Sequence, residues 1–153
     1  MRVLAIDDDE SYRLLVAEML KLAVPQAQVD TYDPVARGFP GSDFDLGAYD
    51  LVLLDYRLGA ENGLDWLRRL KQREHCPAVV MITGEGSESV VVQAIKAGAD
   101  DYLPKERLDR DELRRIVQDA MTARGLQSND ETVQLDTQAI ASGNPQSGLR
   151  IDG

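Results

Sequence analysis

The sequence contains a single cysteine, Cys76, and a single histidine, His75. One cysteine cannot build an internal disulfide framework, and the two residues together are too few for a zinc cluster. A Ser/His/Asp or Cys/His catalytic set is likewise not expected. Any chemistry must therefore come from carboxylates, hydroxyls and lysine.

Basic residues and long apolar runs are also scarce. Lysine and arginine total 17 against 27 acidic residues, so the formal net charge is -10. This balance argues against direct binding of nucleic acid and favours cations or basic protein surfaces as partners. No apolar run approaches 18 residues, and the first ten residues, MRVLAIDDDE, turn acidic too early for a signal peptide. We therefore expect no membrane span and a cytoplasmic location.

The 153 residues, 43% of them hydrophobic, suffice for one domain with a tail. Strand-like and helix-like patterns alternate along the chain, which predicts an α/β fold with a doubly wound, five-stranded parallel sheet. The expected strands are 2–6, 27–32, 51–54, 78–83 and 100–104, and the expected helices are 11–23, 63–73, 87–99 and 109–125. Segment 33–50 is rich in Pro, Gly and Asp and has room only for a short or irregular helix.

The composition changes after Gly125. Residues 126–153 are rich in Gln, Ser, Asn, Asp and Gly and show no clear apolar period. Such a composition is typical of a linker or arm. We therefore predict a folded domain over residues 1–125 and a linker-like C-terminal tail over residues 126–153.

Polar residues follow four of the expected strands. The first strand ends in three acids, Asp7, Asp8 and Asp9; the third is followed by Asp55, the fourth ends in Thr83, and Lys105 follows the fifth. A lone Asp after a strand usually just begins a turn, but the carboxyl ends of parallel strands meet at one edge of the sheet. Several acids in one cleft repel one another, so a hard divalent cation such as Mg²⁺ is the natural counter-charge. A carboxylate, a metal, a hydroxyl and a lysine are also the parts that phosphoryl transfer uses.

The chain resembles the receiver domains of two-component response regulators over residues 2 to about 124. The segments that carry the resemblance are VLAIDDDE, YDLVLLDYRLGAENGLDWL, AVVMITGEG and AGADDYLPK, in the family's order and spacing. The resemblance implies a flavodoxin-like (βα)5 receiver fold. It also implies that Asp55 is the phosphoacceptor and that Asp7, Asp8, Asp55 and the main-chain carbonyl of Arg57 hold Mg²⁺.

The same resemblance assigns several further roles. Thr83 and Lys105 would contact the phosphoryl group, with Thr83 and Tyr102 forming the switch that signals phosphorylation. Arg57 and Glu85 would tune the lifetime of the acyl phosphate. One departure from the family pattern is Glu106, which stands where a proline normally follows the lysine.

The resemblance also predicts the partners. The protein would catalyse its own phosphorylation and dephosphorylation as a switch, taking the phosphoryl group from a cognate histidine kinase or phosphotransfer protein. Its output would be a domain in the same longer chain or a separate effector. A homodimer through residues 87–124 is a further expectation.

Two other functions compete with this interpretation. The segment IDDDES contains the Asp-x-Asp-x-Ser pattern of haloacid dehalogenase-like phosphatases, in which Asp7 would be the nucleophile and Asp9 the acid/base. In that superfamily a lysine precedes the final acidic pair, whereas Lys105 follows Asp100 and Asp101. A phosphorylation-independent interaction module is the second alternative, although such receivers usually lack an acid or the lysine.

Overall fold

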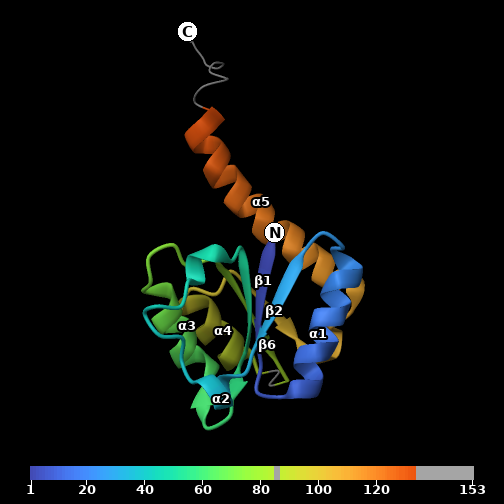
Figure 1. The fold of residues 1–153 in the computed structure, drawn as a ribbon, viewed down its shortest axis with the longest axis vertical. Helices are drawn as coiled ribbons and strands as arrows, with labels where there is room; N and C mark the ends of the chain where they lie inside the picture. The colour runs from blue at the N-terminus through green and yellow to red at the C-terminus, as the bar shows by residue number, and fades with distance from the viewer. Residues whose placement is uncertain (85–86, 134–153) are drawn as a thin grey trace. The chain divides into compact units, whose positions relative to one another are not determined.

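The computed structural model describes residues 1–84 and 87–133 of the chain. Its centre is a five-stranded sheet in the order β2-β1-β3-β6-β7, with all neighbouring strands parallel (Figure 1). The strands are β1 Arg2–Ile6, β2 Gln28–Tyr32, β3 Leu51–Asp55, β6 Ala78–Thr83 and β7 Asp101–Pro104. Every residue of β3 and β6 is buried, as expected for central strands of a parallel sheet covered on both faces. The predicted α/β fold is confirmed.

Helices cover both faces of this sheet. Helix α1 (Glu10–Ala23) lies on one face, and α3 (Gly63–Lys71) and α4 (Glu88–Lys96) lie on the other (Figure 1). The beginning of α5 (Arg110–Val133) lies beside the end of α1, where Arg114 Nε donates a hydrogen bond to the carbonyl of Ala23 at 3.3 Å. Within the described residues, no helix is long and apolar enough to span a membrane.

The helices begin where the sequence supplies a capping side chain. Asp9 accepts hydrogen bonds from the backbone N–H groups of Ser11 and Tyr12, and Asn62 accepts one from Leu64 at 2.6 Å. Ser87 caps α4 in the same way by accepting from Val90. Short polar side chains at these positions satisfy backbone donors that the first helical turn leaves free.

Segment 33–50 forms only short helical pieces, as predicted. They are α2 (Pro34–Arg37), which is capped by Asp33, and a single 3₁₀ turn, η1 (Leu46–Ala48). Two phenylalanines fix the segment to the domain: Phe39 packs edge-on against Trp66 and Phe44 edge-on against Tyr32. Apolar anchoring thus replaces a regular second helix.

The structure corrects two details of the sequence prediction. The last helix does not end near Gly125 but continues to Val133, because a single glycine costs a helix only about 1 kcal/mol and no proline lies between Gly125 and Val133. The predicted tail therefore begins inside a helix, and its remainder, 134–153, lies outside the described residues. A two-stranded antiparallel hairpin, β4 (Arg57–Leu58) with β5 (Glu61–Asn62), was not expected.

The chain divides into two compact units, Met1–Gln118 and Asp119–Gly153. The sheet, α1 to α4 and the first turns of α5 belong to the first unit. The predicted boundary at Gly125 is not tested by this division and stays a prediction.

Candidate functional site

The strand register brings the predicted polar residues to one level at the edge of the sheet. Asp55, the last residue of β3, pairs with Ile82, the neighbour of Thr83 on β6. Thr83 in turn pairs with Pro104, and Lys105 is the next residue. Asp7 directly follows β1, whose last residue Ile6 pairs with Leu54. Four residues from four strand ends therefore meet because the strands end in step.

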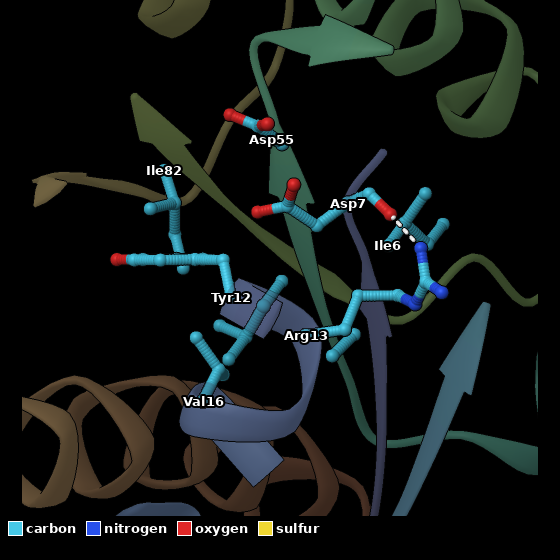
Figure 2. Close-up of a pocket in the computed structure, with 9 residues that line it drawn as sticks. Ile6, Asp7, Tyr12, Arg13, Val16, Asp55 and Ile82 are labelled. Carbon is cyan, nitrogen blue, oxygen red and sulfur yellow. Dashed lines mark hydrogen bonds between the residues drawn. The ribbon is translucent and has the colours of Figure 1, made fainter. Parts of the chain in front are cut away.

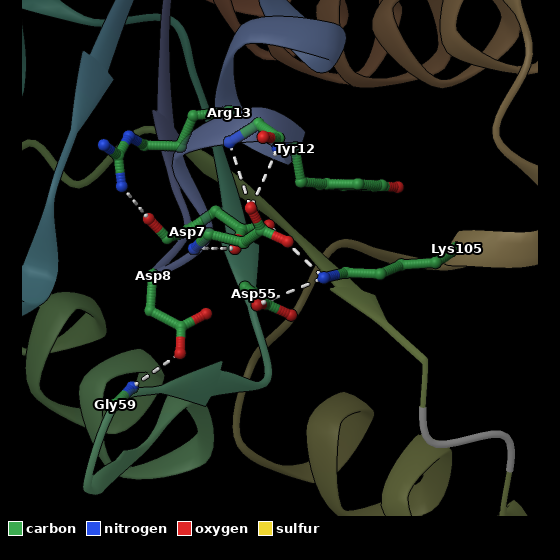
Figure 3. Close-up of polar contacts among 9 residues, drawn as sticks. Asp7, Asp8, Tyr12, Arg13, Asp55, Gly59 and Lys105 are labelled. Atoms are coloured by element: carbon green, nitrogen blue, oxygen red, sulfur yellow. Dashed lines mark hydrogen bonds and ion pairs between the residues drawn. The ribbon is translucent and has the colours of Figure 1, made fainter.

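Three carboxylates gather at this edge. Asp7, Asp8 and Asp55 each offer a carboxylate oxygen, and these oxygens all lie within 4.8 Å of one another. Asp7 and Asp55 are buried, whereas Asp8 is exposed and accepts a hydrogen bond from the backbone N–H of Gly59 at 3.1 Å (Figure 3). Clustered carboxylate oxygens are the ligands that hard divalent cations prefer. The cluster could therefore hold a metal ion.

Lys105 supplies the positive charge of the site. Its Nζ lies 3.4 Å from Asp7 Oδ2 and 3.4 Å from Asp55 Oδ2 (Figure 3). The same Nζ lies over the ring of Tyr12, 4.1 Å from its centroid. A single ammonium thus faces two buried carboxylates and one aromatic ring.

Burial controls the protonation of the two inner carboxylates. Burial and the nearby charge of Asp7 raise the pKa of Asp55 to about 7, although Lys105 acts in the opposite direction. Burial likewise raises the pKa of Asp7 above its usual value. Both shifts mean that the site favours either a proton or an added cation over two bare charges.

A small cavity of about 10 Å³ lies behind the carboxylates, lined by Asp7, Asp55, Tyr12 and Arg13 among others (Figure 2). A space of this size is close to the minimum for one water molecule. Arg13 Nη1 donates to the main-chain carbonyl of Asp7 at 2.7 Å, and its other terminal nitrogen lies 3.8 Å from the Asp33 carboxylate. Arg13 therefore links the acidic loop after β1 to the cap of α2.

The remaining predicted residues lie around this centre. Thr83 is buried, with 1% of its surface exposed, and Arg57 is an exposed residue that opens β4. Tyr102 lies on β7, half-buried against the hydrophobic core. Glu85, a predicted lifetime residue, lies outside the described residues.

Three residues of the site were missed by the sequence analysis: Tyr12, Arg13 and Gly59. Tyr12 and Arg13 lie in the first turns of α1, where a helical apolar pattern hides individual contacts. Gly59 has a backbone φ of 70°, which glycine adopts without strain, and lies in the hairpin turn that was not expected. A glycine three to four residues after a strand-end Asp is a signal that could have indicated such a turn.

Asp9 bears on the phosphatase alternative. In that interpretation Asp9 would be the acid/base beside Asp7, but its carboxylate is occupied as the cap of α1, 3.0 Å from the N–H of Ser11. Asp55, which has no role in that alternative, is instead a buried member of the cluster.

Comparison with known proteins identifies the family. The family model described as "Response regulator receiver domain" matches residues 3–118. The chain belongs to this family. Its receiver fold is also similar to a solved receiver domain from Clostridium thermocellum, with a TM-score of 0.72, 25% identity, and coverage of 82% of this chain and 97% of that one.

Two curated relatives are longer than this receiver chain. The transcriptional regulatory protein CpxR of Escherichia coli K12 is 30% identical over 97% of this chain, which spans 64% of CpxR. The response regulator protein PilR of Pseudomonas aeruginosa is 32% identical over 97% of this chain, which spans 32% of PilR. The chain is thus a receiver domain of the two-component response regulators, a family of signalling switches, and the haloacid dehalogenase alternative is wrong.

Proposed function

We propose that Asp55 is the phosphoacceptor of this receiver domain. The observation that carries the proposal is the position of its carboxylate: buried at the end of β3, 3.4 Å from the Lys105 ammonium and within the three-acid cluster. A buried nucleophile flanked by positive charge is suited to attack a group that is itself negative. A phosphorylation-independent module would usually have lost an acid or the lysine of this site. Asp7, Asp8, Asp55 and Lys105 are all present in this chain.

The cluster fits Mg²⁺ as the metal. Asp7, Asp8 and Asp55 would hold it, with the main-chain carbonyl of Arg57 as a further predicted ligand. The raised pKa values of Asp7 and Asp55 are what uncompensated carboxylates in a metal site would show. When bound, Mg²⁺ supplies positive charge beside the phosphoryl oxygens.

The residues of the chain divide the transfer step between them. An Asp55 carboxylate oxygen forms a bond to phosphorus while the P–N bond of a phosphohistidine, or the P–O bond of acetyl phosphate, breaks. The leaving group departs with the bonding electrons: the histidine nitrogen takes up a proton from solvent, whereas acetate leaves as the anion. Lys105 balances charge on the phosphoryl oxygens, and the Thr83 hydroxyl donates to one of them.

Hydrolysis of the acyl phosphate would reset the switch. We assign Arg57 and Glu85 to the control of this step, because both follow strand ends beside the phosphoryl group by two residues. Their charged side chains would shield the phosphate from water. The Arg57→Ala variant should still be labelled, but its acyl phosphate should decay about 2- to 5-fold faster, which corresponds to about 0.4 to 1 kcal/mol. An unchanged decay rate would show that Arg57 does not have this role.

Phosphorylation would be transmitted through Thr83 and Tyr102 to the face formed by α4, β7 and the start of α5. This face would contact an output domain or effector, or a second copy of the chain through residues 87–124. The phosphoryl donor would be a histidine kinase or phosphotransfer protein in the cytoplasm. If amide chemical-shift changes on adding beryllofluoride stay at the Asp55 pocket and spare α4 and β7, this route is wrong.

Replacement of Asp55 tests the proposal directly. Asp55→Asn should abolish Mg²⁺-dependent labelling by acetyl phosphate, because the amide cannot form the acyl phosphate. Asp65→Asn, an exposed carboxylate on α3, is the matched control and should label like the unmodified protein. A label that persists in Asp55→Asn but disappears in Asp7→Asn would transfer the nucleophile to Asp7.

A further inference from the structure

The ammonium of Lys105 is held from two sides. On one side lie the carboxylates of Asp7 and Asp55, each 3.4 Å from Nζ. On the other side lies the ring of Tyr12, whose centroid is 4.1 Å from the same atom. Figure 3 shows the Tyr12 ring extending along the Lys105 side chain rather than toward the carboxylates. An ammonium at this distance over a ring face is attracted by the negative face of the π-system.

The backbone around Lys105 offers little support of its own. Lys105 opens a 3₁₀ turn, η2 (Lys105–Arg107), in which none of the three residues is buried and no side chain caps the turn. A long lysine side chain on such a turn has many accessible rotamers. Contacts at its far end must therefore select the conformation that reaches Asp55.

Tyr12 itself is well fixed. It lies in the first turns of α1, where the Asp9 carboxylate accepts a hydrogen bond from its backbone N–H. Its hydroxyl is buried and has no hydrogen-bond partner among the described residues. A buried hydroxyl without a partner is unfavourable, so the hydroxyl does not explain the tyrosine. The ring face, which Lys105 uses, does.

We propose that Tyr12 is a positioning residue that holds the Lys105 ammonium against Asp55 through a cation–π contact, and so sets the rate of phosphoryl transfer. The inference rests on the proposed role of Asp55 as phosphoacceptor. Tyr12 touches neither the phosphoryl group nor the metal in this scheme. It acts through Lys105 alone.

Two substitutions at Tyr12 distinguish the effect of the aromatic ring face from the effect of side-chain bulk. Tyr12→Leu keeps an apolar side chain but removes the π-face, and should lower the rate of labelling by acetyl phosphate at saturating Mg²⁺ by at least about threefold. Tyr12→Phe keeps the ring and should recover most of that rate. Leu14→Ala, an exposed leucine on the same helix, controls for general effects of altering α1.

The affinity for Mg²⁺ distinguishes the release of Lys105 from structural damage to the cleft, because the two would change the affinity in different directions. Lys105 and a bound cation share Asp7 and Asp55 as partners, so releasing Lys105 should leave the dissociation constant of Mg²⁺ unchanged or lower it. Damage to the cleft would raise that constant. Slower labelling of Tyr12→Leu with unimpaired Mg²⁺ binding supports the inference. The inference is overturned if Tyr12→Leu labels as fast as the unmodified protein, if Tyr12→Phe loses as much of the rate as Tyr12→Leu, or if Tyr12→Leu binds Mg²⁺ more weakly.

A spectroscopic test needs no variant at Tyr12 and holds even if Tyr12→Leu does not fold. The sequence has only four lysines, and the εCH₂ protons of Lys105 should be shifted upfield by the Tyr12 ring relative to those of the other three. The absence of such a shift in the folded protein would overturn the contact itself. If instead the unmodified protein takes no label at Asp55, the proposed function fails while the upfield shift remains.

Discussion

Asp55 gives the metal-free protein an unusual dependence on pH. The folded state raises the pKa of this carboxyl to about 7, whereas the unfolded chain leaves it near its ordinary value of 3.8. Between these two values the folded state binds more protons than the unfolded state. The contribution of Asp55 to stability is therefore fully present below about pH 4 and is lost as the pH rises toward about 7.

Comparison of Asp55→Asn with the unmodified protein isolates this effect. Without Mg²⁺, the variant should become increasingly more stable than the unmodified protein as the pH rises from about 4 to about 7, by about 1 to 4 kcal/mol in total. Urea unfolding at a series of pH values measures the difference. Millimolar Mg²⁺ should reduce the difference, since it compensates the charge that the variant lacks. A difference independent of pH would show that Asp55 is not strained by its surroundings.

The positions of Asp7, Asp55, Thr83 and Lys105 could be predicted from the sequence because each follows a strand of a parallel sheet. Periodicity locates the strands, and the topology then brings their ends together. Tyr12 could not be predicted, since its partner Lys105 lies on a different element and the contact depends on the direction of two side chains. The roles of all these residues stay predictions until labelling is measured.

The element that most constrains the site is the connection from β3 to α3. Gly63, the first residue of α3, donates its backbone N–H to the carbonyl of Tyr56 at 2.6 Å. A Cβ atom on Gly63 would lie 2.3 Å from the carbonyl oxygen of Asp55 and 2.9 Å from Tyr56 Cα. Neither backbone atom can move without displacing the Asp55 side chain from the cluster. Glycine is therefore required here by close packing.

Gly63→Ala should destabilise the domain by about 3 kcal/mol and reduce labelling at Asp55 as the β3–α3 connection shifts. Gly84→Ala is the matched control, because its Cβ would meet nothing closer than Lys105 Cδ at 4.0 Å. Thermal unfolding compares the two variants. Equal stability of both would show that the connection is softer than its geometry indicates.

The elements that the sequence did not predict are short or lack a stop signal. Each strand of the β4–β5 hairpin has two residues, too few to show an alternating pattern. Helix α5 continues past Gly125 because no residue directly after the glycine forces a turn. The residues after Gly125 are mostly polar, so an apolar period cannot reveal that they are helical. Long, buried elements were predicted within one to three residues at each end, apart from this helix.

At the scale of the whole molecule, the site belongs to one of the two units. All residues placed in the site lie between Asp7 and Lys105, within Met1–Gln118. The match to the family model also ends at residue 118. A chain cut after Gly125 keeps this unit complete. It should fold and take up label from acetyl phosphate within about twofold of the full chain. A truncated chain that unfolds cooperatively but does not label would show that the C-terminal residues take part in the chemistry.

The hairpin turn also connects the acidic cluster to the only tryptophan in the chain. Gly59 of the turn binds the Asp8 carboxylate, and Glu61 of β5 accepts a hydrogen bond from Trp66 Nε1 at 2.8 Å. Trp66 is fully buried, so its emission depends on this neighbour and on the rings packed around it rather than on solvent. A cation that draws Asp8 away from Gly59 would loosen the turn beside the indole. We therefore expect the fluorescence of Trp66 to change as Mg²⁺ is titrated into the protein, without any attached dye.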